Sequence, residues 1–347
     1  MSNASHCAEP LPSEQALIEQ LPSYDFRNAL VLSPGRAQTA AALHQLNDAA
    51  QITAWYIDLH QATLARATTG DYVRVECSAD LPEESYDLVA FALSMRGEAE
   101  LTRDLLQQSH GRLVDGGMLV TAVDNPRDQW LREQLEGMFD KVTCITAKQG
   151  RVYIARKTKP LRKIRSFQAE VVFRDDERLI KLVTRPGVFA HRQLDPGARQ
   201  LMLSVEIDAN QRVLDLGCGS GALALAASLR APGVTAFAVD SNARAIQCVT
   251  LGAELNAVSG LQTLLNSDGQ LEVDDSIDVV LCNPPYFSDF EIAEKMVRTA
   301  QQALRPGGAA LFVNKQPKWY KERLPQSFSD VEIIPSAKYW VACGRKP

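Results

Sequence analysis

The sequence predicts an α/β protein that consists of two tandem domains, each built on a largely parallel β-sheet. Apolar runs typical of buried strands alternate with longer helical stretches along both halves of the chain. Parts of the first half recur in the second at a constant interval. The matched pairs are Ser85–Val89 with Ser276–Val280 and Gly116-Gly117 with Gly307-Gly308. A length of 347 residues is comfortable for two such domains, so we expect a duplicated fold.

Residues 1–24 are predicted to form a polar extension that precedes the first domain. Met1–Pro12 lacks the cationic and apolar pattern of a signal peptide, and the chain has no run of about 18 apolar residues that could span a membrane. The seven cysteines form no C-x-x-C pair, which is typical of reduced thiols. No histidine lies between Arg192 and Pro347, which argues against a histidine-ligated metal there. We therefore expect a cytoplasmic, monomeric protein without a metal.

The first domain, residues 25–158, is predicted to be a degenerate copy of the second. Its first strand runs into Ser33-Pro34-Gly35-Arg36-Ala37, where the second half has alternating glycines. Proline and arginine cannot replace glycines that let a ligand approach the backbone. A later strand that ends in Asp58 is matched with the strand that ends in Asp240, and Ala92–Met95 stands where the second half carries its most distinctive motif. We expect this domain to serve folding or recognition.

Residues 159–169 are predicted to be a basic linker between the domains. Every charged side chain from Lys148 to Gln168 is a lysine or an arginine. Such a stretch suits a phosphate backbone, and a solvated linker is a comparable interpretation. Near the C-terminus, Lys315–Arg323 mixes basic and aromatic residues, which suits unpaired RNA or an ordinary surface loop. The net charge of −5 argues against a protein that coats nucleic acid generally, but it does not exclude one with a local basic face.

The second domain, residues 170–347, is predicted to open with a hairpin in residues 170–184 and to carry the chemistry. Its strand Arg212–Leu216 includes Asp215 and leads into three glycines at alternate positions: Gly217, Gly219 and Gly221. Glycine is needed where a backbone turns tightly or approaches a ligand. The pattern D-x-G-x-G-x-G differs from the dinucleotide fingerprint G-x-G-x-x-G. Its acid is better placed for a cationic ammonium group than for a pyrophosphate.

Two further acids follow the next two predicted strands. Asp240 ends the apolar run 234–239, and its carboxylate can accept hydrogen bonds from both hydroxyls of a ribose. Asp268 follows the run Leu261–Leu265 and can accept from an adenine amine. Taken singly, each is as well explained as a helix cap or a turn residue. Their order and spacing favour a nucleoside-containing ligand.

The motif Asn283-Pro284-Pro285-Tyr286 follows the buried strand Ile277–Cys282. Two consecutive prolines end the strand, because neither can donate to a sheet and each restricts the residue before it. The amide oxygen of Asn283 and the carbonyl of Pro284 can accept from an NH2 group, while Tyr286 can stack on a planar ring. By itself the motif is equally consistent with a proline-rich turn. In this context it favours a planar substrate that bears an amine.

With these motifs in this order, the second half resembles the class I S-adenosylmethionine-dependent methyltransferases that methylate amino groups. The resemblance implies two tandem Rossmann-like domains, the N-terminal one degenerate, and S-adenosyl-L-methionine as the cofactor. It implies cofactor binding by Asp215, Gly217, Gly219, Gly221, Asp240, Asp268 and Asn283. It implies catalysis by Asn283, Pro284 and Tyr286, since the Asn-Pro-Pro-Tyr/Phe loop of that family holds the target nitrogen.

More narrowly, the chain is similar to the bacterial ribosomal RNA guanine-N2 methyltransferases. The similarity rests on three further elements: Arg185-Pro186-Gly187-Val188-Phe189, Leu194-Asp195-Pro196-Gly197, and Val313-Asn314 with Pro317 and Tyr320. Those enzymes usually have Asn-Pro-Pro-Phe-His, whereas this chain has Tyr286 and Phe287 in the last two places. The resemblance implies methyl transfer to the N2 amine of a guanine, with ribosomal RNA as the partner.

Two other functions remain open. The methyl group can go to another amino group, adenine N6 or a protein glutamine amide, since the glutamine-methylating release-factor enzymes also carry Asn-Pro-Pro-Tyr but have a different N-terminal domain. The chain can also be a non-catalytic, cofactor-binding factor for RNA assembly. The complete set of glycines and the complete fourth motif argue against that last interpretation.

Overall fold

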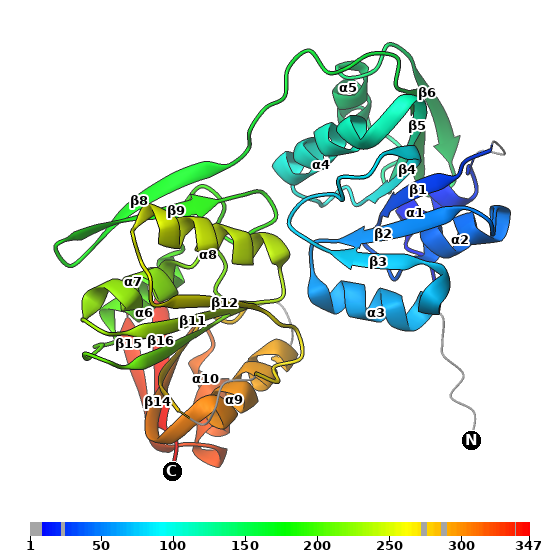
Figure 1. The fold of residues 1–347 in the computed structure, drawn as a ribbon. Helices are drawn as coiled ribbons and strands as arrows, with labels where there is room; N and C mark the ends of the chain where they lie inside the picture. The colour runs from blue at the N-terminus through cyan, green and yellow to red at the C-terminus, as the bar shows by residue number, and fades with distance from the viewer. Residues whose placement is uncertain (1–8, 22–24, 272–275, 286–289, 337) are drawn as a thin grey trace, which may run out of the picture. The chain divides into compact units, whose positions relative to one another are not determined.

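The computed structural model describes residues 9–21, 25–271, 276–285, 290–336 and 338–347. The chain divides into two compact units, Met1–Phe167 and Gln168–Pro347 (Figure 1). Each unit contains one seven-stranded mixed sheet with helices, as the sequence predicted for two tandem α/β domains.

The first unit has the strand order β3-β2-β1-β4-β5-β7-β6. Its strands are β1 (Asn28–Leu32), β2 (Gln51–Tyr56), β3 (Arg74–Cys77), β4 (Tyr86–Leu93), β5 (Leu113–Val123), β6 (Val142–Ala147) and β7 (Gly150–Arg156). Its helices are α1 (Pro12–Ile18), α2 (Gln38–Leu46), α3 (Leu59–Thr69), α4 (Ala99–Arg112) and α5 (Trp130–Glu136), with a 3₁₀ turn η1 (Gly70–Tyr72). Strands β1 to β5 are parallel, and β7 runs antiparallel to both of its neighbours.

The second unit repeats this order as β12-β11-β10-β13-β14-β16-β15. Its strands are β10 (Arg212–Leu216), β11 (Thr235–Asp240), β12 (Leu261–Leu265), β13 (Ile277–Cys282), β14 (Leu304–Asn314), β15 (Ser329–Ser336) and β16 (Tyr339–Arg345). Its helices are α6 (Pro196–Leu203), α7 (Ala222–Arg230), α8 (Ala243–Leu255), α9 (Glu291–Ala303) and α10 (Pro317–Arg323), with a 3₁₀ turn η2 (Leu324–Gln326). The predicted hairpin, β8 (Ala169–Asp175) and β9 (Arg178–Thr184), forms a separate two-stranded sheet beside α8 (Figure 1).

The central strands form because they are apolar on both faces. In β13 the side chains from Val279 to Cys282 are all buried, as expected for a parallel strand covered by helices on either side. Alternate residues of the neighbouring strand β10 enter two different cores: Val213 packs with α6 and α7, and Leu214 packs with α9. This sandwich fixes the carboxyl ends of β10, β11 and β13 relative to one another.

Three local features differ from the sequence analysis. Residues 1–24 are not only a polar extension, because Pro12–Ile18 form α1, with Ala16 and Leu17 in the core of the first unit. The helix is short and includes the buried Glu14, so its composition concealed it. The second difference concerns the basic linker, which is attached to the first unit at Arg165. The backbone N–H of Arg165 donates to the side chain of Gln107 in α4 at 2.9 Å, and its carbonyl accepts from that side chain at 3.0 Å.

The third difference concerns Asp58, which is not the counterpart of Asp240. In the parallel pairs, Leu32 faces Trp55 and Leu216 faces Val239. The residue after Trp55 is Tyr56, and it therefore takes the place of Asp240. Asp58 instead caps α3 by accepting from the backbone of Gln61. Over the described ranges, no helix has the length and apolar character needed to cross a membrane.

Candidate active site

The predicted site residues gather where the strand order of the second unit reverses. Strand β10 lies between β11 and β13, with Leu216 facing both Val239 and Cys282. The residues that follow these three strands, including the glycines, Asp240 and Asn283, are therefore neighbours at one edge of the sheet. Crevices at such reversal points are the usual ligand sites of open α/β sheets.

The three glycines all adopt left-handed backbone conformations, with φ of 73° at Gly217, 53° at Gly219 and 82° at Gly221. They differ in what surrounds them. A Cβ on Gly217 would lie 2.9 Å from Met296 Cε, and one on Gly221 would lie 2.7 Å from Val249 Cγ2. Among the described residues, a Cβ on Gly219 would meet nothing closer than 3.9 Å. Packing against Val249 thus requires glycine at position 221, and the flexible end of Met296 would have to move for a side chain at position 217. Gly219 leaves the backbone open to a ligand as far as the described residues go.

Asp215 is a buried carboxylate with an unused oxygen. It is 1% exposed, and its Oδ2 accepts from the backbone N–H of Ala224 at 3.1 Å. Within the described part of the chain, Oδ1 has no hydrogen-bond partner. Burial raises the pKa of Asp215 to about 7; the Ala224 bond opposes that rise and the nearby Asp240 adds to it. An unpaired buried carboxylate is costly, so this site favours a cationic donor.

Asp240 connects the glycine loop to the start of α8. Its Oδ2 accepts from the backbone of Gly219 and its Oδ1 from the backbone of Asn242, both at 2.9 Å. Asn242 in turn caps α8 by accepting from Arg244 and Ala245. A carboxylate only accepts hydrogen bonds, which is the chemistry that the hydroxyl groups of a ligand require.

Asp268 lies on the surface, in a turn after β12. Its Oδ1 accepts from the backbone of Gln270 at 2.8 Å and from the side chain of Asn266 at 3.0 Å. These bonds, the backbone one first, lower the pKa of Asp268. The turn role considered for this residue in the sequence is therefore present, and its contact with an adenine stays a prediction.

The loop after β13 places Asn283 against the start of α6. Its Nδ2 donates to Asp195 Oδ2 at 2.8 Å. The same carboxylate oxygen accepts from the backbone of Ala198 and thereby caps α6. Pro284 is buried. Tyr286, the predicted stacking residue, lies outside the described residues.

The segment 185–195 runs from the glycine loop to Asn283. At its beginning, the fully buried Arg244 donates to the carbonyl of Pro186 at 2.9 Å, and the Asn242 side chain donates to that of Gly187 at 2.7 Å. Phe189 is 61% exposed and lies beside Gly219. The other end is Asp195. The segment 185–195 therefore borders both the glycine loop and Asn283.

Sequence reasoning used Asp195 only as part of a family element and assigned no role to Asn242 or Arg244. A helix-capping signal was available for two of them. Asp195 precedes Pro196 and Asn242 precedes Ala243, each at the start of a helix. No local pattern reveals which loop such a cap also touches.

The basic and aromatic cluster Lys315–Arg323 is mostly engaged within the second unit. The Trp319 ring stacks on Phe290 with 4.7 Å between centroids, and Tyr320 is buried. Arg323 pairs with Glu294 at 2.6 Å. Those two rings serve packing, which leaves the exposed lysines as the part of this cluster that suits RNA.

Comparison with known sequences places the chain among methyltransferases. Residues 179–342 match the family model described as the methyltransferase small domain. The chain is 31% identical over 266 residues to the ribosomal RNA large subunit methyltransferase G of Pseudomonas savastanoi pv. phaseolicola, an alignment that covers 71% of this chain and 68% of the relative. For the protein of the same name in Pseudomonas putida (strain W619), identity is 34% over 182 residues, half of this chain and 48% of the relative. The chain thus spans about half the length of that relative.

Two further similarities extend over nearly the whole chain. The ribosomal RNA small subunit methyltransferase C of Shewanella loihica is 25% identical over 345 residues, which cover 96% of this chain and 98% of the relative. The T. thermophilus 16S rRNA guanine-N2 methyltransferase, solved with AdoMet and guanosine, superposes with a TM-score of 0.82 at 21% identity. That match covers 97% of this chain and 92% of the other, and it shows the same two-domain fold.

Proposed function

Because the chain belongs to the family of two-domain ribosomal RNA methyltransferases, we propose that it transfers a methyl group from S-adenosylmethionine to the N2 amine of a guanine in ribosomal RNA. One observation carries this proposal. Two adjacent strands of one sheet end in groups that suit the two reactants. Strand β10 carries the buried Asp215 and leads into the open glycine loop, and β13 leads into Asn283, whose amide has a fixed orientation. The first suits the cofactor, and the second suits an amine.

The residues around the glycine loop fit S-adenosylmethionine. The unused Oδ1 of Asp215 can accept from the ammonium of the methionine part. Gly219 leaves room for close approach to the backbone, and the carboxylate of Asp240 beside it is an acceptor of the kind that ribose hydroxyls require. We assign cofactor binding to these residues together with Gly217, Gly221, Asp268 and Asn283. When bound, the cofactor supplies an electrophilic methyl group on a sulfonium sulfur.

The target amine is a weak nucleophile, because its lone pair is delocalised into the ring. We assign to Asn283 Oδ1 and to the Pro284 carbonyl the role of accepting its two hydrogens. Asp195 holds the Asn283 nitrogen, which supports this assignment because the amide oxygen, the acceptor that an amine requires, is then directed away from Asp195. The two acceptors favour a pyramidal nitrogen, on which the lone pair is localised and no longer shared with the ring. We assign to Tyr286 the role of stacking on the base. Positioning then accounts for most of the rate enhancement.

We assign residues 170–347 to catalysis, residues 25–158 to recognition or folding, and residues 159–169 to a linker that contacts RNA. Arg162, Lys163 and Arg165 are exposed, which supports a role in phosphate binding. A base inside a duplex is out of reach of such a site, so the target must be unpaired or flipped out. We expect a monomeric enzyme of the cytoplasm that uses no metal.

Nucleoside mass spectrometry tests the proposed function. Ribosomal RNA from a strain that lacks the protein should lose one N2-methylguanosine and regain it after incubation with the purified chain and S-adenosylmethionine. Loss of a methylated adenosine, or of a methylated glutamine in a protein, would instead identify one of the other amino groups. Unchanged modification in both RNA and protein would contradict enzymatic activity.

A further inference from the structure

Asp195 makes two hydrogen bonds with a single carboxylate oxygen. One, from the backbone N–H of Ala198 at 2.8 Å, caps α6. The other, from Nδ2 of Asn283 at 2.8 Å, joins residues that are 88 positions apart in the sequence. A helix cap needs only the first bond, so the second calls for a separate explanation.

The second bond determines which way the Asn283 amide faces. A carboxylate can only accept, so the NH2 arm of Asn283 must point toward Asp195. If the amide were turned over, two oxygens would meet at hydrogen-bond distance and repel each other. Because the amide is planar, fixing its nitrogen also fixes its oxygen. The bond is charge-assisted, which makes it stronger than a bond between neutral groups.

The helix that carries Asp195 is itself firmly held. Leu201 and Met202 of α6 are buried in a core shared with β14. At the far end of the helix, Arg230 donates to the carbonyl of Met202 at 2.7 Å and forms an ion pair with the buried Asp175 at 2.8 Å. Asp195 therefore acts on Asn283 from a rigid support, as precise positioning requires.

The first unit provides an internal comparison. Helix α1 precedes β1 as α6 precedes β10, and it packs on β5 and β7 as α6 packs on β14 and β16. Its N-cap residue is Leu11, whose side chain makes no capping bond. The counterpart of Asn283 is Ala92, since Leu32 faces Phe91 as Leu216 faces Cys282. The degenerate copy lacks both partners of the bond.

We propose that Asp195 is a positioning residue for the target amine, which acts through Asn283 by directing the amide oxygen toward the substrate. This inference rests on the proposed function. It goes beyond helix capping, because the carboxylate of Asp195 sets the geometry of a residue that touches the reacting nitrogen.

Three substitutions separate this role from the cap. Asp195→Ser keeps a good N-cap but is too short to reach Asn283. Asp195→Asn keeps the cap and can still accept from Asn283, without the charge. Asp195→Ala loses both bonds. Asp58→Ser is the matched control, because Asp58 caps α3 of the first unit in the same way.

The experiment measures single-turnover methylation of ribosomal RNA, S-adenosylmethionine affinity and thermal unfolding on full-length protein. Asp195→Ser should slow the methyl-transfer step about 10- to 100-fold, the range expected for a misplaced reacting group. Its cofactor Kd and melting temperature should remain those of the unsubstituted protein. Asp195→Asn should stay within about tenfold of the unsubstituted rate, and Asp58→Ser should not change it.

A double-substitution cycle tests whether Asp195 acts through Asn283. In a chain that already carries Asn283→Ala, adding Asp195→Ser should cause no further loss of rate. An unsubstituted rate in Asp195→Ser, a full further loss in the double variant, or a loss in Asp195→Asn as large as in Asp195→Ser would each overturn the inference. Absence of methylation by the unsubstituted chain would instead contradict the proposed function.

Discussion

The two units of this chain have the same sheet and differ at the ends of its strands. Strand order and register repeat, so each site residue of the second unit has an identifiable counterpart in the first. The counterparts of Asp215, Gly217, Asp240 and Asn283 are Val31, Ser33, Tyr56 and Ala92. None of the four replacements keeps the chemistry. The fold depends on the apolar strands, whereas ligand binding depends on a few residues that the fold does not require.

The first unit covers the loop that corresponds to the glycine loop of the second. The counterpart of Gly219 is Gly35, and a Cβ there would lie 2.1 Å from Glu14 Oε2. Glu14 comes from α1, is fully buried, and accepts hydrogen bonds from the Ser33 hydroxyl and the Leu11 backbone. Burial raises its pKa. Where the second unit leaves its loop open, the first covers it with an acid.

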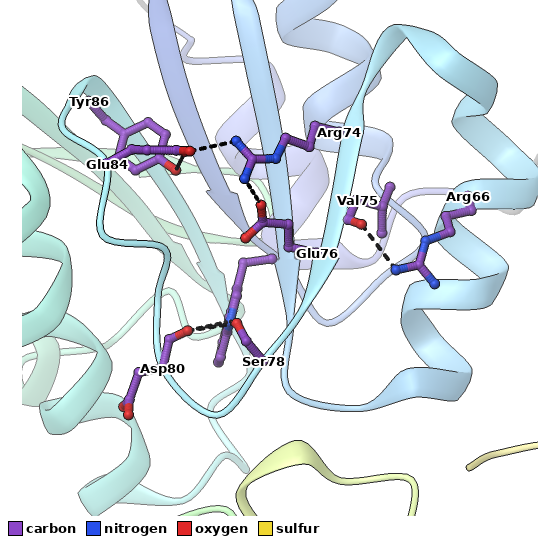
Figure 2. A network of polar contacts seen from close by, with 9 residues as sticks. Arg66, Arg74, Val75, Glu76, Ser78, Asp80, Glu84 and Tyr86 are labelled. Carbon is purple, nitrogen blue, oxygen red and sulfur yellow. Dashed lines mark hydrogen bonds and ion pairs between the residues drawn. The ribbon is translucent and has the colours of Figure 1, made fainter. Parts of the chain in front are cut away.

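The loop after β3 is likewise built into the scaffold of the first unit. Ser78 donates to the carbonyl of Tyr56 as Asn266 donates to that of Asp240, which makes Asp80 the counterpart of Asp268. The carbonyl of Asp80 accepts from the Ser78 hydroxyl (Figure 2). It also accepts from the Trp55 indole at 3.1 Å. Its carboxylate accepts from Gln108 of α4 at 2.8 Å. An acid retained in place can thus serve packing alone.

Substitution of Asn283 should lower the methylation rate far more than the matched substitution in the first unit, and this is the largest effect that we expect. Asn283→Ala removes an acceptor for the target amine, so single-turnover methylation should fall about a hundredfold or more. Cofactor affinity should stay nearly intact, because Asn283 is one of seven residues assigned to the cofactor and the other six are unchanged. Ser94→Ala, in the corresponding loop of the first unit, should leave the rate unchanged. A rate within about threefold of the unsubstituted protein in Asn283→Ala would show that the loop is only structural.

Substitution of Gly219 and of its counterpart Gly35 should separate effects on S-adenosylmethionine affinity from effects on the stability of the fold. Gly219→Ala puts a methyl group where a ligand would approach, so S-adenosylmethionine affinity measured by calorimetry should fall at least about tenfold. The positive φ should cost about 1–2 kcal/mol of unfolding free energy. Gly35→Ala should show the opposite pattern, with stability lost to the clash with Glu14 and affinity unchanged. Equal loss of affinity in both variants would contradict the assignment of the cofactor to the second unit alone.

Much of this comparison could be predicted from sequence. Apolar runs and the constant interval were enough to identify two sheets, because buried parallel strands are continuous in sequence. The candidate site residues that directly follow strands could be proposed for the same reason, and their roles stay predictions. The Asp195–Asn283 bond could not be found, because its partners are distant and each has an adequate local explanation. The position of Tyr56 was missed because an acid, Asp58, lies two residues away and was matched with Asp240 instead.

The pKa of Asp215 predicts how pH acts on the second unit. Its pKa of about 7 is raised above the ordinary value of 3.8, so the native state binds more protons than the unfolded state between these values. The free energy of unfolding of the ligand-free protein should therefore fall as pH rises through this window, by up to about 1.4 kcal/mol per pH unit. S-adenosylmethionine should bind up to about tenfold more tightly per unit over the same range, because the ionised form accepts from its ammonium.

Calorimetry between pH 5 and 8 would measure both trends. Asp215→Asn should abolish the pH dependence of affinity in that range. Glu14→Gln, the change at the buried acid of the first unit, should leave it intact. A dependence that survives in Asp215→Asn would assign the titration to another group.

The smallest effect is expected from the basic linker, residues 159–169, which belongs to neither of the two seven-stranded sheets. Neutralising Arg162, Lys163 and Arg165 should weaken RNA binding several-fold. The log–log salt slope should decrease by roughly 0.7 to 0.9 for each phosphate that the variant no longer neutralises. Phosphate contacts position RNA without specifying its sequence, so the weakening should be similar for unrelated RNAs.

The matched control neutralises Arg174, Arg178 and Lys181, three exposed basic residues on the β8–β9 hairpin of the second unit. Binding measured by filter retention or anisotropy across a salt series compares the two triple variants. If RNA follows the linker, only the first variant should flatten the salt slope, and cofactor affinity should be unchanged in both. If the hairpin variant has the larger effect, the RNA path lies on the catalytic unit, and the degenerate copy contributes folding and not recognition. If neither changes the slope, the linker is a solvated connection and the exposed lysines of Lys315–Arg323 become the next surface to test.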